Sequence, residues 1–187
     1  MAAPGSLVPS EGRLLVASPS IGDPNFARTV VGLLEHDDEV GSLGVVLNRP
    51  TEFAVDAALP QWGAMVTGPP VLFVGGPVAE GSALGLARVE GDTTLGWTEV
   101  FDQLALVDLE NPPDNGEVSA LRIYTGYAGW GTGQLRAELR EGSWWVFDSR
   151  PEDWFSVEPE FLWETVLRRQ GGLFRMWADA PEDPVVN

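Results

Sequence analysis

The chain has 187 residues, 44% of them hydrophobic, which is enough for one compact core and short for two independent domains. Its formal net charge is -17, because 28 acidic residues outnumber 11 basic residues that are all arginine, and this negative field repels nucleic-acid phosphates. The chain has no cysteine, so disulfide scaffolds, thiolate metal sites and cysteine nucleophiles are excluded.

The two ends of the chain lack the apolar residues that a packed segment needs. Residues 1–12 and 178–187 are rich in Pro, Gly, Ala and acid, and we expect two disordered tails around one domain of residues 13–177. No signal-peptide pattern opens the sequence, and no uncharged apolar run approaches the roughly 18 residues of a membrane span. We therefore expect a cytoplasmic protein with no membrane partner and no direct nucleic-acid partner.

The first quarter of the chain predicts a strand, a loop and a hairpin. Residues 13–17 form an apolar run typical of a buried strand, and residues 18–24 hold two prolines and a glycine that indicate an irregular loop. Residues 29–34 and 43–47, rich in Val and Leu, flank an acidic turn at residues 36–39. This pattern predicts a hairpin whose strands are covered on both faces.

The middle of the chain alternates turn signals with short apolar runs. Residues 48–51 contain a proline that should stop the preceding strand. Residues 54–59 suggest one or two helical turns. Residues 111–116 are a strong turn signal. The apolar runs predict further strands at residues 71–74, 84–89, 104–107, 121–124 and 144–147.

Two helices are predicted in the last third. The first covers residues 134–140, with Thr132 as its N-cap and Gly142 just past its end. The second covers residues 159–169, begins at a proline and ends before a glycine. Strands outnumber helices without strict βαβ alternation, so we predict an α+β fold: a single domain with a mixed, partly barrel-like β-sheet and a few flanking helices.

A glycine-rich segment lies between the strand at residues 121–124 and the helix at residues 134–140. Its glycines are Gly126, Gly129, Gly131 and Gly133, and we expect a loop in which Gly129 or Gly131 has a positive φ. The loop amides could hold an anion beside the helix N-terminus. A purely structural turn is the alternative, because the segment has neither a phosphate-binding lysine nor the G-x-G-x-x-G spacing.

Polar residues near the hairpin give weaker signals. His36 adjoins the acidic residues 37–39, which could hold a metal or supply a base, although consecutive acids at a hairpin tip are typical of a solvated turn. Asn48 and Arg49 follow a strand end, where polar groups often meet ligands, although Arg49 could simply neutralise carboxylates. One histidine and no G-x-S-x-G context give little support to a Ser-His-Asp triad.

The sequence strongly resembles the YqgE/AlgH family of bacterial proteins. Four stretches carry the resemblance, in the family's order: Gly12–Ala17 with Pro19, Asp23, Phe26, Glu35 and His36; Gly44–Pro50; Gly75–Val78; and Gly126–Leu135. The resemblance implies a single α+β domain, a cytosolic location and, by the family's name, a regulator of transcription. No helix has the basic face of a DNA-recognition helix.

The family's motifs, carried onto this sequence, are polar and glycine positions at strand ends. They form no recognisable catalytic set and imply no cofactor and no metal. The candidate ligand- or partner-binding residues are Asp23, His36, Asn48, Arg49, Gly75, Gly76, Gly126, Gly129, Trp130, Gly133 and Gln134.

Two hypotheses of function follow. The first is a non-enzymatic regulator that binds an unknown protein or small molecule, without direct DNA contact, through one continuous surface formed by the asparagine, arginine and glycine positions. The second is a nucleotide- or phosphate-binding protein or a hydrolytic enzyme, in which the glycine segment holds an anion, Arg49 adds charge and His36 or Asp23 is the base. Convergence of these three side chains in one pocket would favour the second.

Overall fold

The structure is a computed structural model that describes residues 7–90, 97–112 and 118–180. Its framework is a ten-stranded sheet with the order β10-β1-β2-β3-β9-β6-β8-β7, and β4 and β5 lie off this path. The strands are β1 (Arg13–Ala17), β2 (Val30–Asp37), β3 (Gly41–Val46), β4 (Pro50–Ala54), β5 (Val71–Val74), β6 (Val78–Val89), β7 (Thr98–Phe101), β8 (Leu104–Val107), β9 (Val118–Trp130) and β10 (Trp144–Asp148).

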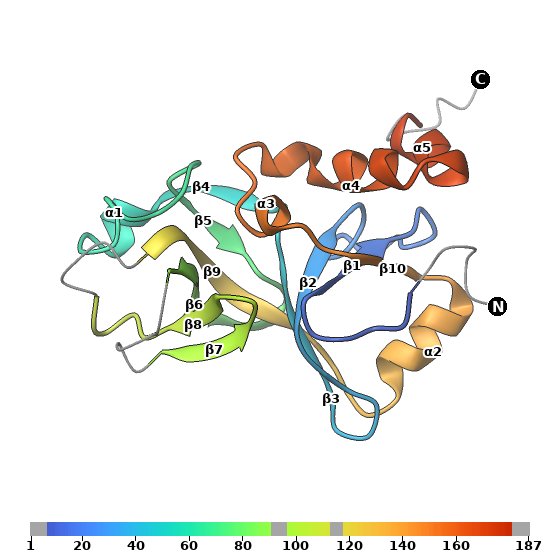
Figure 1. Ribbon diagram of the computed structural model, residues 1–187, viewed down its shortest axis with the longest axis horizontal. Coiled ribbons are helices and arrows are strands. Elements are labelled where there is room, and N and C mark those ends of the chain that lie inside the picture. Colours follow the sequence, from blue (N-terminus) through green and yellow to red (C-terminus); the bar gives the residue numbers. More distant parts are fainter. Residues whose placement is uncertain (1–6, 91–96, 113–117, 181–187) are drawn as a thin grey trace.

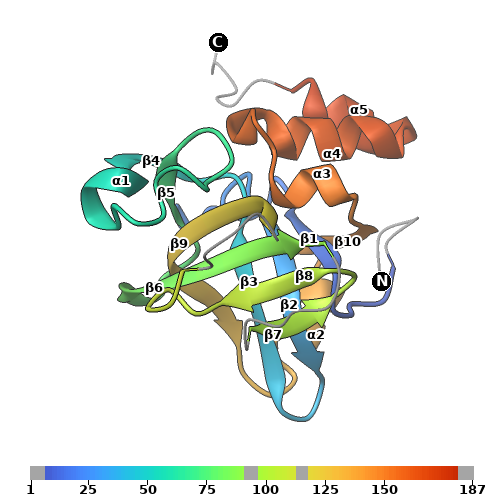
Figure 2. The same cartoon turned by 60° about the vertical axis from the view of Figure 1, so that its left-hand side comes forward.

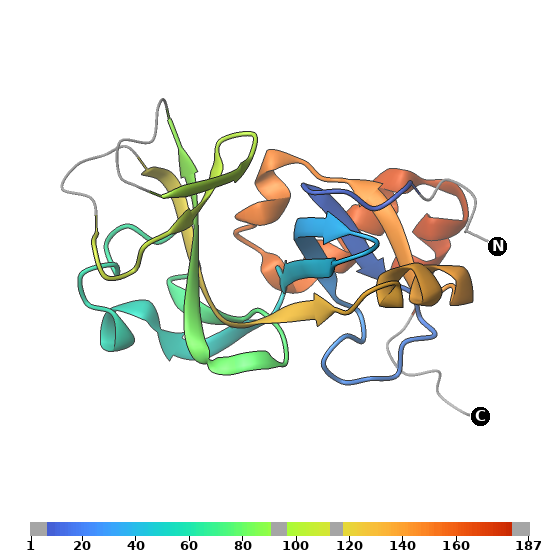
Figure 3. The same ribbon diagram turned by 90° about the horizontal axis from the view of Figure 1, so that it is seen from below.

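The long strand β9 joins two halves of the sheet. Its first part pairs with β6, and its end pairs with β3, where Trp130 lies opposite Ser42. The sheet therefore curls, with β10, β1, β2 and β3 on one side of β9 and the other strands on the other side (Figure 3). Figure 2 shows β9, β6, β8 and β7 side by side. The β5–β9 pair is parallel and the other described pairs are antiparallel, which confirms a mixed, partly barrel-like sheet.

Helices cover both faces of the half that contains β1 (Figure 1). Alternate residues of β1 point to opposite faces: Leu14 and Val16 join a core with the C-terminal helices, whereas Leu15 and Ala17 join a core with α2. The helices are α1 (Val55–Ala58), α2 (Gln134–Glu141), α3 (Pro151–Trp154), the 3₁₀ helix η1 (Pro159–Phe161), α4 (Leu162–Gln170) and α5 (Gly172–Ala178). None of the helices in the described ranges is long and apolar enough to cross a membrane.

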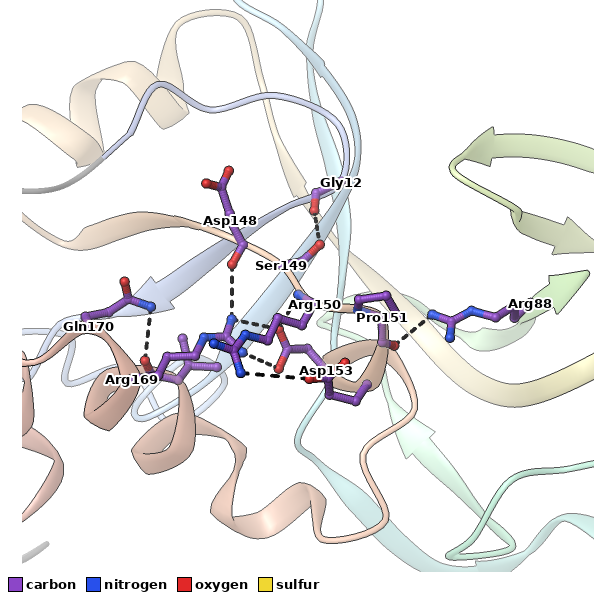
Figure 4. Close-up of polar contacts among 11 residues, drawn as sticks. Gly12, Arg88, Asp148, Ser149, Arg150, Pro151, Asp153, Arg169 and Gln170 are labelled. Atoms are coloured by element: carbon purple, nitrogen blue, oxygen red, sulfur yellow. Dashed lines mark hydrogen bonds and ion pairs between the residues drawn. The ribbon is translucent and has the colours of Figure 1, made fainter.

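A buried ion pair fastens α3 and α4 to the sheet (Figure 4). The Nη1 and Nη2 atoms of Arg169 each lie 2.7 Å from a carboxylate oxygen of Asp153, and Nη2 also donates to the Asp148 carbonyl at the end of β10. The Arg150 amide donates to the same carboxylate, and Arg88 of β6 reaches the Pro151 carbonyl. This polar cluster therefore links both halves of the sheet to the C-terminal helices.

The predicted strands are present, several of them longer than predicted. The helices predicted at residues 134–140 and 159–169 are also present, the second as η1 followed by α4. Four elements were not predicted: β4, β7, α3 and α5. Strand β3 ends before Pro50, as expected, but Pro50 also opens β4. Among the described residues β4 pairs with β5 alone, so it is an edge strand that tolerates a proline. Thr132 is not the N-cap of α2, because Gly133 holds that position.

Parts of the chain ends lie outside the described residues. Residues 1–6 and 181–187 belong to the two predicted tails and are not described, and residues 113–116 of the predicted turn are not described either. Within the described part, the Leu7 amide donates to the Val146 carbonyl at 2.9 Å, and Ala178 is the last residue of α5. Packing contacts therefore extend on both sides of residues 13–177.

Candidate functional site

The glycine-rich segment is mostly strand, not the loop that the sequence predicts. β9 continues to Trp130, so only Gly131, Thr132 and Gly133 connect it to α2. The positive φ angles are at Gly126 (67°) and Gly133 (69°), so the prediction for Gly129 or Gly131 is wrong. The physical reason is the pairing of residues 128–130 with β3, which keeps the chain extended and delays the reversal to Gly133.

Gly75, Gly76 and Gly126 lie where two backbones cross. A Cβ at Gly75 would overlap the Gly126 carbonyl, one at Gly76 would overlap the backbone of Tyr127, and one at Gly126 would overlap the Gly76 carbonyl. The Gly75 amide donates to the Thr125 carbonyl at 2.8 Å. These three glycines let the β5–β6 connection pass against β9.

Two of the three amides in the short connection between β9 and α2 donate hydrogen bonds within the protein. The Gly131 amide donates to Gln134 Oε1 at 3.0 Å, and the Gly133 amide donates to the Asp38 carbonyl at 3.2 Å. The hydroxyl of Thr132 donates to the Glu39 carbonyl rather than to α2. Two of the three amides and the hydroxyl are thus used within the protein, which favours the structural turn over the anion cradle.

A cavity of about 340 Å³ lies between α2, β9 and the loop that joins β1 to β2. It brings together four of the predicted residues: Asp23, Gly129, Trp130 and Gln134. We call it the Trp130 cavity. Its lining residues are Ile21, Asp23, Phe26, Gly129, Trp130, Gln134, Glu138, Ser143 and Trp144.

Glu138 is held rigidly in the wall of the Trp130 cavity. Its Oε2 accepts the indole N–H of Trp130 at 2.9 Å and that of Trp144 at 2.8 Å. Its Oε1 accepts the side-chain amide of Gln134 at 2.8 Å. Glu138 is not among the residues predicted from the sequence, although its place four residues after Gln134 puts both on one helix face.

Aromatic rings form the apolar wall beside this carboxylate. The ring centroids of Trp130 and Trp144 are 5.8 Å apart in an edge-to-face arrangement, and Phe26 lies 5.6 Å from Trp144 and 6.3 Å from Trp130. Trp130 is 6% exposed and Trp144 is 3% exposed, so packing fixes both indoles. Asp23 is exposed, and its Oδ1 accepts the Asn25 amide, which shapes the loop.

Asn48 and Arg49 line a second cavity, of about 390 Å³, which we call the Arg49 cavity. Asn48 is buried, accepts the Val30 amide and donates to the Arg28 carbonyl, both at 2.9 Å. Arg49 donates from Nη2 to the Ala27 carbonyl at 2.6 Å. Asn48 therefore acts on the backbone, whereas Arg49 fixes the loop and also faces a cavity.

His36 lies in a third cavity, of about 470 Å³, beside the carboxylates of Glu35 and Asp37. Its Nδ1 is 2.7 Å from the Ser42 hydroxyl, and its Nε2 is 3.9 Å from Asp38. A hydrogen bond from Arg136 lowers the pKa of Asp38.

The three side chains of the enzyme hypothesis do not converge. His36, Asp23 and Arg49 each line a different cavity. In the described residues, no group of three or more His, Asp or Glu side chains is arranged to hold a metal ion.

Comparison with known proteins places the chain in one family. A family model for AlgH-like proteins matches residues 14–175. The chain is 54% identical to a UPF0301 protein of Streptomyces coelicolor over 183 residues, with 94% of each chain covered, and 42% identical to a UPF0301 protein of Thermobifida fusca, again with 94% of each covered.

Two solved structures share the fold. One is the crystal structure of a Corynebacterium diphtheriae protein, with a TM-score of 0.86, 30% identity and 94% of each chain covered. The other is the solution structure of AlgH from Pseudomonas aeruginosa, with a TM-score of 0.67, 27% identity and 97% of each chain covered. The chain belongs to the AlgH-like family, as its sequence motifs indicated.

Proposed function

We propose that this protein is a non-catalytic regulator that binds a cationic group, an ammonium or guanidinium on an apolar body, in the Trp130 cavity. The observation that carries the proposal is the fixed carboxylate of Glu138 beside an aromatic wall. The regulatory part of the proposal rests on the family's name, and it involves no direct contact with DNA.

The residues that line the Trp130 cavity have the charge and the aromatic rings that suit a cationic ligand. Two carboxylates, Asp23 and Glu138, line the cavity together with no basic residue. An ionised carboxylate can accept about four hydrogen bonds, and Glu138 receives three from the protein, which leaves capacity for a ligand donor. Indole faces attract cations, and Phe26 and Ile21 offer contact for an apolar body.

The net charge of the whole chain also favours a cationic ligand. A net charge of -17 concentrates cations around the protein and favours their approach. The cationic group can belong to a small molecule or to an arginine or lysine side chain of a partner protein, because both present the same donors. The geometry of Glu138 suits binding rather than catalysis, since its two carboxylate oxygens already accept three hydrogen bonds from the protein.

A thermal-shift series tests the proposal. Benzylamine, benzyl alcohol and benzoate have similar apolar bodies and differ in charge, and arginine-containing and lysine-containing peptides represent the partner. We expect benzylamine or one of the basic peptides to raise Tm, and the neutral and anionic compounds to leave it unchanged. A ligand at about 100 times its Kd adds roughly 2.7 kcal/mol of stability, which is readily measured.

Two variants and one control assign the effect to the cavity. Glu138→Gln and the rim variant Asp23→Asn should both reduce the shift. Glu141→Gln makes the same charge change at an exposed position of α2 outside the lining and should leave the shift unchanged. Equal shifts with benzylamine and benzoate, or an undiminished shift in Asp23→Asn and Glu138→Gln, would refute the cation proposal.

A further inference from the structure

The Arg49 guanidinium is anchored on one side and open on the other. Its Nη2 atom donates to the carbonyl of Ala27 at 2.6 Å and to that of Pro24 at 3.4 Å. No described residue accepts a hydrogen bond from its Nε or Nη1, and the side chain is half-buried where it lines the cavity. A guanidinium has five N–H donors and cannot lose its charge, so charged donors remain for a ligand.

Arg28 brings a second guanidinium to the same cavity. Its φ is 55°, in a region that residues other than glycine rarely adopt. Asn48 holds this backbone in place by bonding the Arg28 carbonyl and the Val30 amide. The Arg28 guanidinium lies 4.3 Å from the centroid of the Trp163 ring and is paired with Glu164. Strained backbone that the surroundings hold in place is typical of binding sites.

We propose that the Arg49 cavity binds an oxyanion, a carboxylate or phosphate group of a small molecule, with Arg49 as the main donor. Charge-assisted hydrogen bonds from arginine to such groups are short and strong. Arg28 pairs with Glu164, so among the described lining residues the exposed Glu160 is the one carboxylate without a paired arginine that opposes the charge of Arg49. The net charge of -17 favours small anions over polyanions such as nucleic acid.

This site is separate from the Trp130 cavity and takes the opposite charge. The two cavities share no lining residue, although the loop between β1 and β2 contributes to both. Failure of one proposal therefore leaves the other standing.

An NMR titration at constant ionic strength tests the proposal, with inorganic phosphate and malonate as the two probes. We expect saturable shifts of the indole N–H signal of Trp163, a lining residue of the cavity whose N–H donates to the Ala17 carbonyl. Arg49→Gln should weaken binding by at least about tenfold. Arg140→Gln removes the same charge from an exposed position outside the cavity lining and should bind as the wild type does.

Arg49→Gln could also loosen the loop between β1 and β2 that Arg49 anchors, so a second variant is needed that does not disturb this loop. Glu160→Gln leaves the anchors of Arg49 intact and removes the opposing charge, so we expect tighter binding of both probes. A preference between phosphate and malonate in this variant identifies the class of oxyanion. Equal affinity in wild type and Arg49→Gln, or no saturable binding of either anion by wild type and Glu160→Gln, would overturn the proposal.

Discussion

Arg122 and Tyr124 are polar side chains that β9 carries into the core. Arg122 is 1% exposed, lies 4.2 Å from the centroid of the Phe73 ring, and donates to the carbonyls of Gly68 and Ser156. Burial lowers the pKa of Arg122 and raises the pKa of Tyr124 to about 12. Arg122 thus holds the segment before β5 and the segment after α3 to the sheet.

Tyr124 should make the protein sensitive to alkali. In the unfolded chain this phenol ionises near pH 10, whereas the folded protein keeps its proton to about pH 12. Between these values the folded state binds more protons, so stability falls as pH rises, by about 3 kcal/mol at the upper limit. Urea unfolding followed by fluorescence at several pH values should show this loss in wild type and a smaller one in Tyr124→Phe. The same pH dependence in both proteins would contradict this account.

Gly126 should be the glycine of β9 that tolerates a side chain least. Its φ is positive, and a Cβ would overlap the Gly76 carbonyl and lie 2.8 Å from the Val78 carbonyl. We expect Gly126→Ala to lower the free energy of unfolding by at least about 2 kcal/mol in urea denaturation. Gly131→Ala is the control, since the nearest atom to its Cβ would be 3.9 Å away. Similar stability of the two variants would count against the crossing geometry.

Among the secondary-structure elements, the strands were predicted well from apolar runs. A strand that is packed on both faces of the sheet needs a continuous run of apolar residues, as at residues 13–17. The glycines of β9 misled the prediction, because pairing with β3 and β6 outweighs their weak strand propensity. Gly171 indicated the end of a helix, yet α5 begins at the very next residue, Gly172. It forms because Phe174 packs 5.0 Å from both Trp145 and Phe147, a long-range contact that local sequence does not reveal.

Only part of the candidate site could be predicted, because its cavities also depend on long-range contacts. Asp23, Trp130 and Gln134 do meet in one cavity. Arg49 and His36 belong elsewhere, because β2 carries His36 toward the hairpin tip while the β3–β4 connection carries Arg49 toward α4. Which strand ends share a cavity depends on the curl of the sheet, and this is a property of the whole fold.

The ion pair between α3 and α4 should be a large contribution to their docking. Arg169→Gln leaves the carboxylate of Asp153, whose side chain is 3% exposed, without its cation. We expect a loss of about 3–5 kcal/mol in chemical denaturation. The neighbouring Arg168→Gln removes a surface pair with Asp179 and should cost less than about 1 kcal/mol. If both variants lost the same small amount, the pair would not fasten the helices.

At the scale of the whole molecule, charge and shape limit the partners. The curled sheet presents three separate cavities in the described residues, and each has its own charge pattern. The net charge of -17 surrounds all of them. A positively charged side chain that faces a cavity, such as Arg49, therefore indicates a binding site for an anion. Small anions suit such a site better than polyanions, which the net charge repels.

Duplex DNA should not bind the protein measurably at physiological salt. Affinity for DNA rests largely on counterion release by clustered Lys and Arg, and this chain has no lysine. Fluorescence anisotropy with a random duplex at about 0.15 M salt should show no saturation in the micromolar range. Salt-sensitive binding below micromolar concentration would contradict the prediction and the indirect regulation that we propose.

Binding of a cation in the Trp130 cavity should be visible in the indole N–H signals of the two tryptophans beside Glu138. Trp130 and Trp144 donate these hydrogens to Glu138, so a cation at the carboxylate must alter both signals. In a ¹⁵N NMR titration with benzylamine, we expect saturable shifts of these two signals and an unchanged signal for Trp163 in the Arg49 cavity. Unchanged Trp130 and Trp144 signals with benzylamine and with the basic peptides, or equal shifts with benzoate, would contradict cation binding in this cavity.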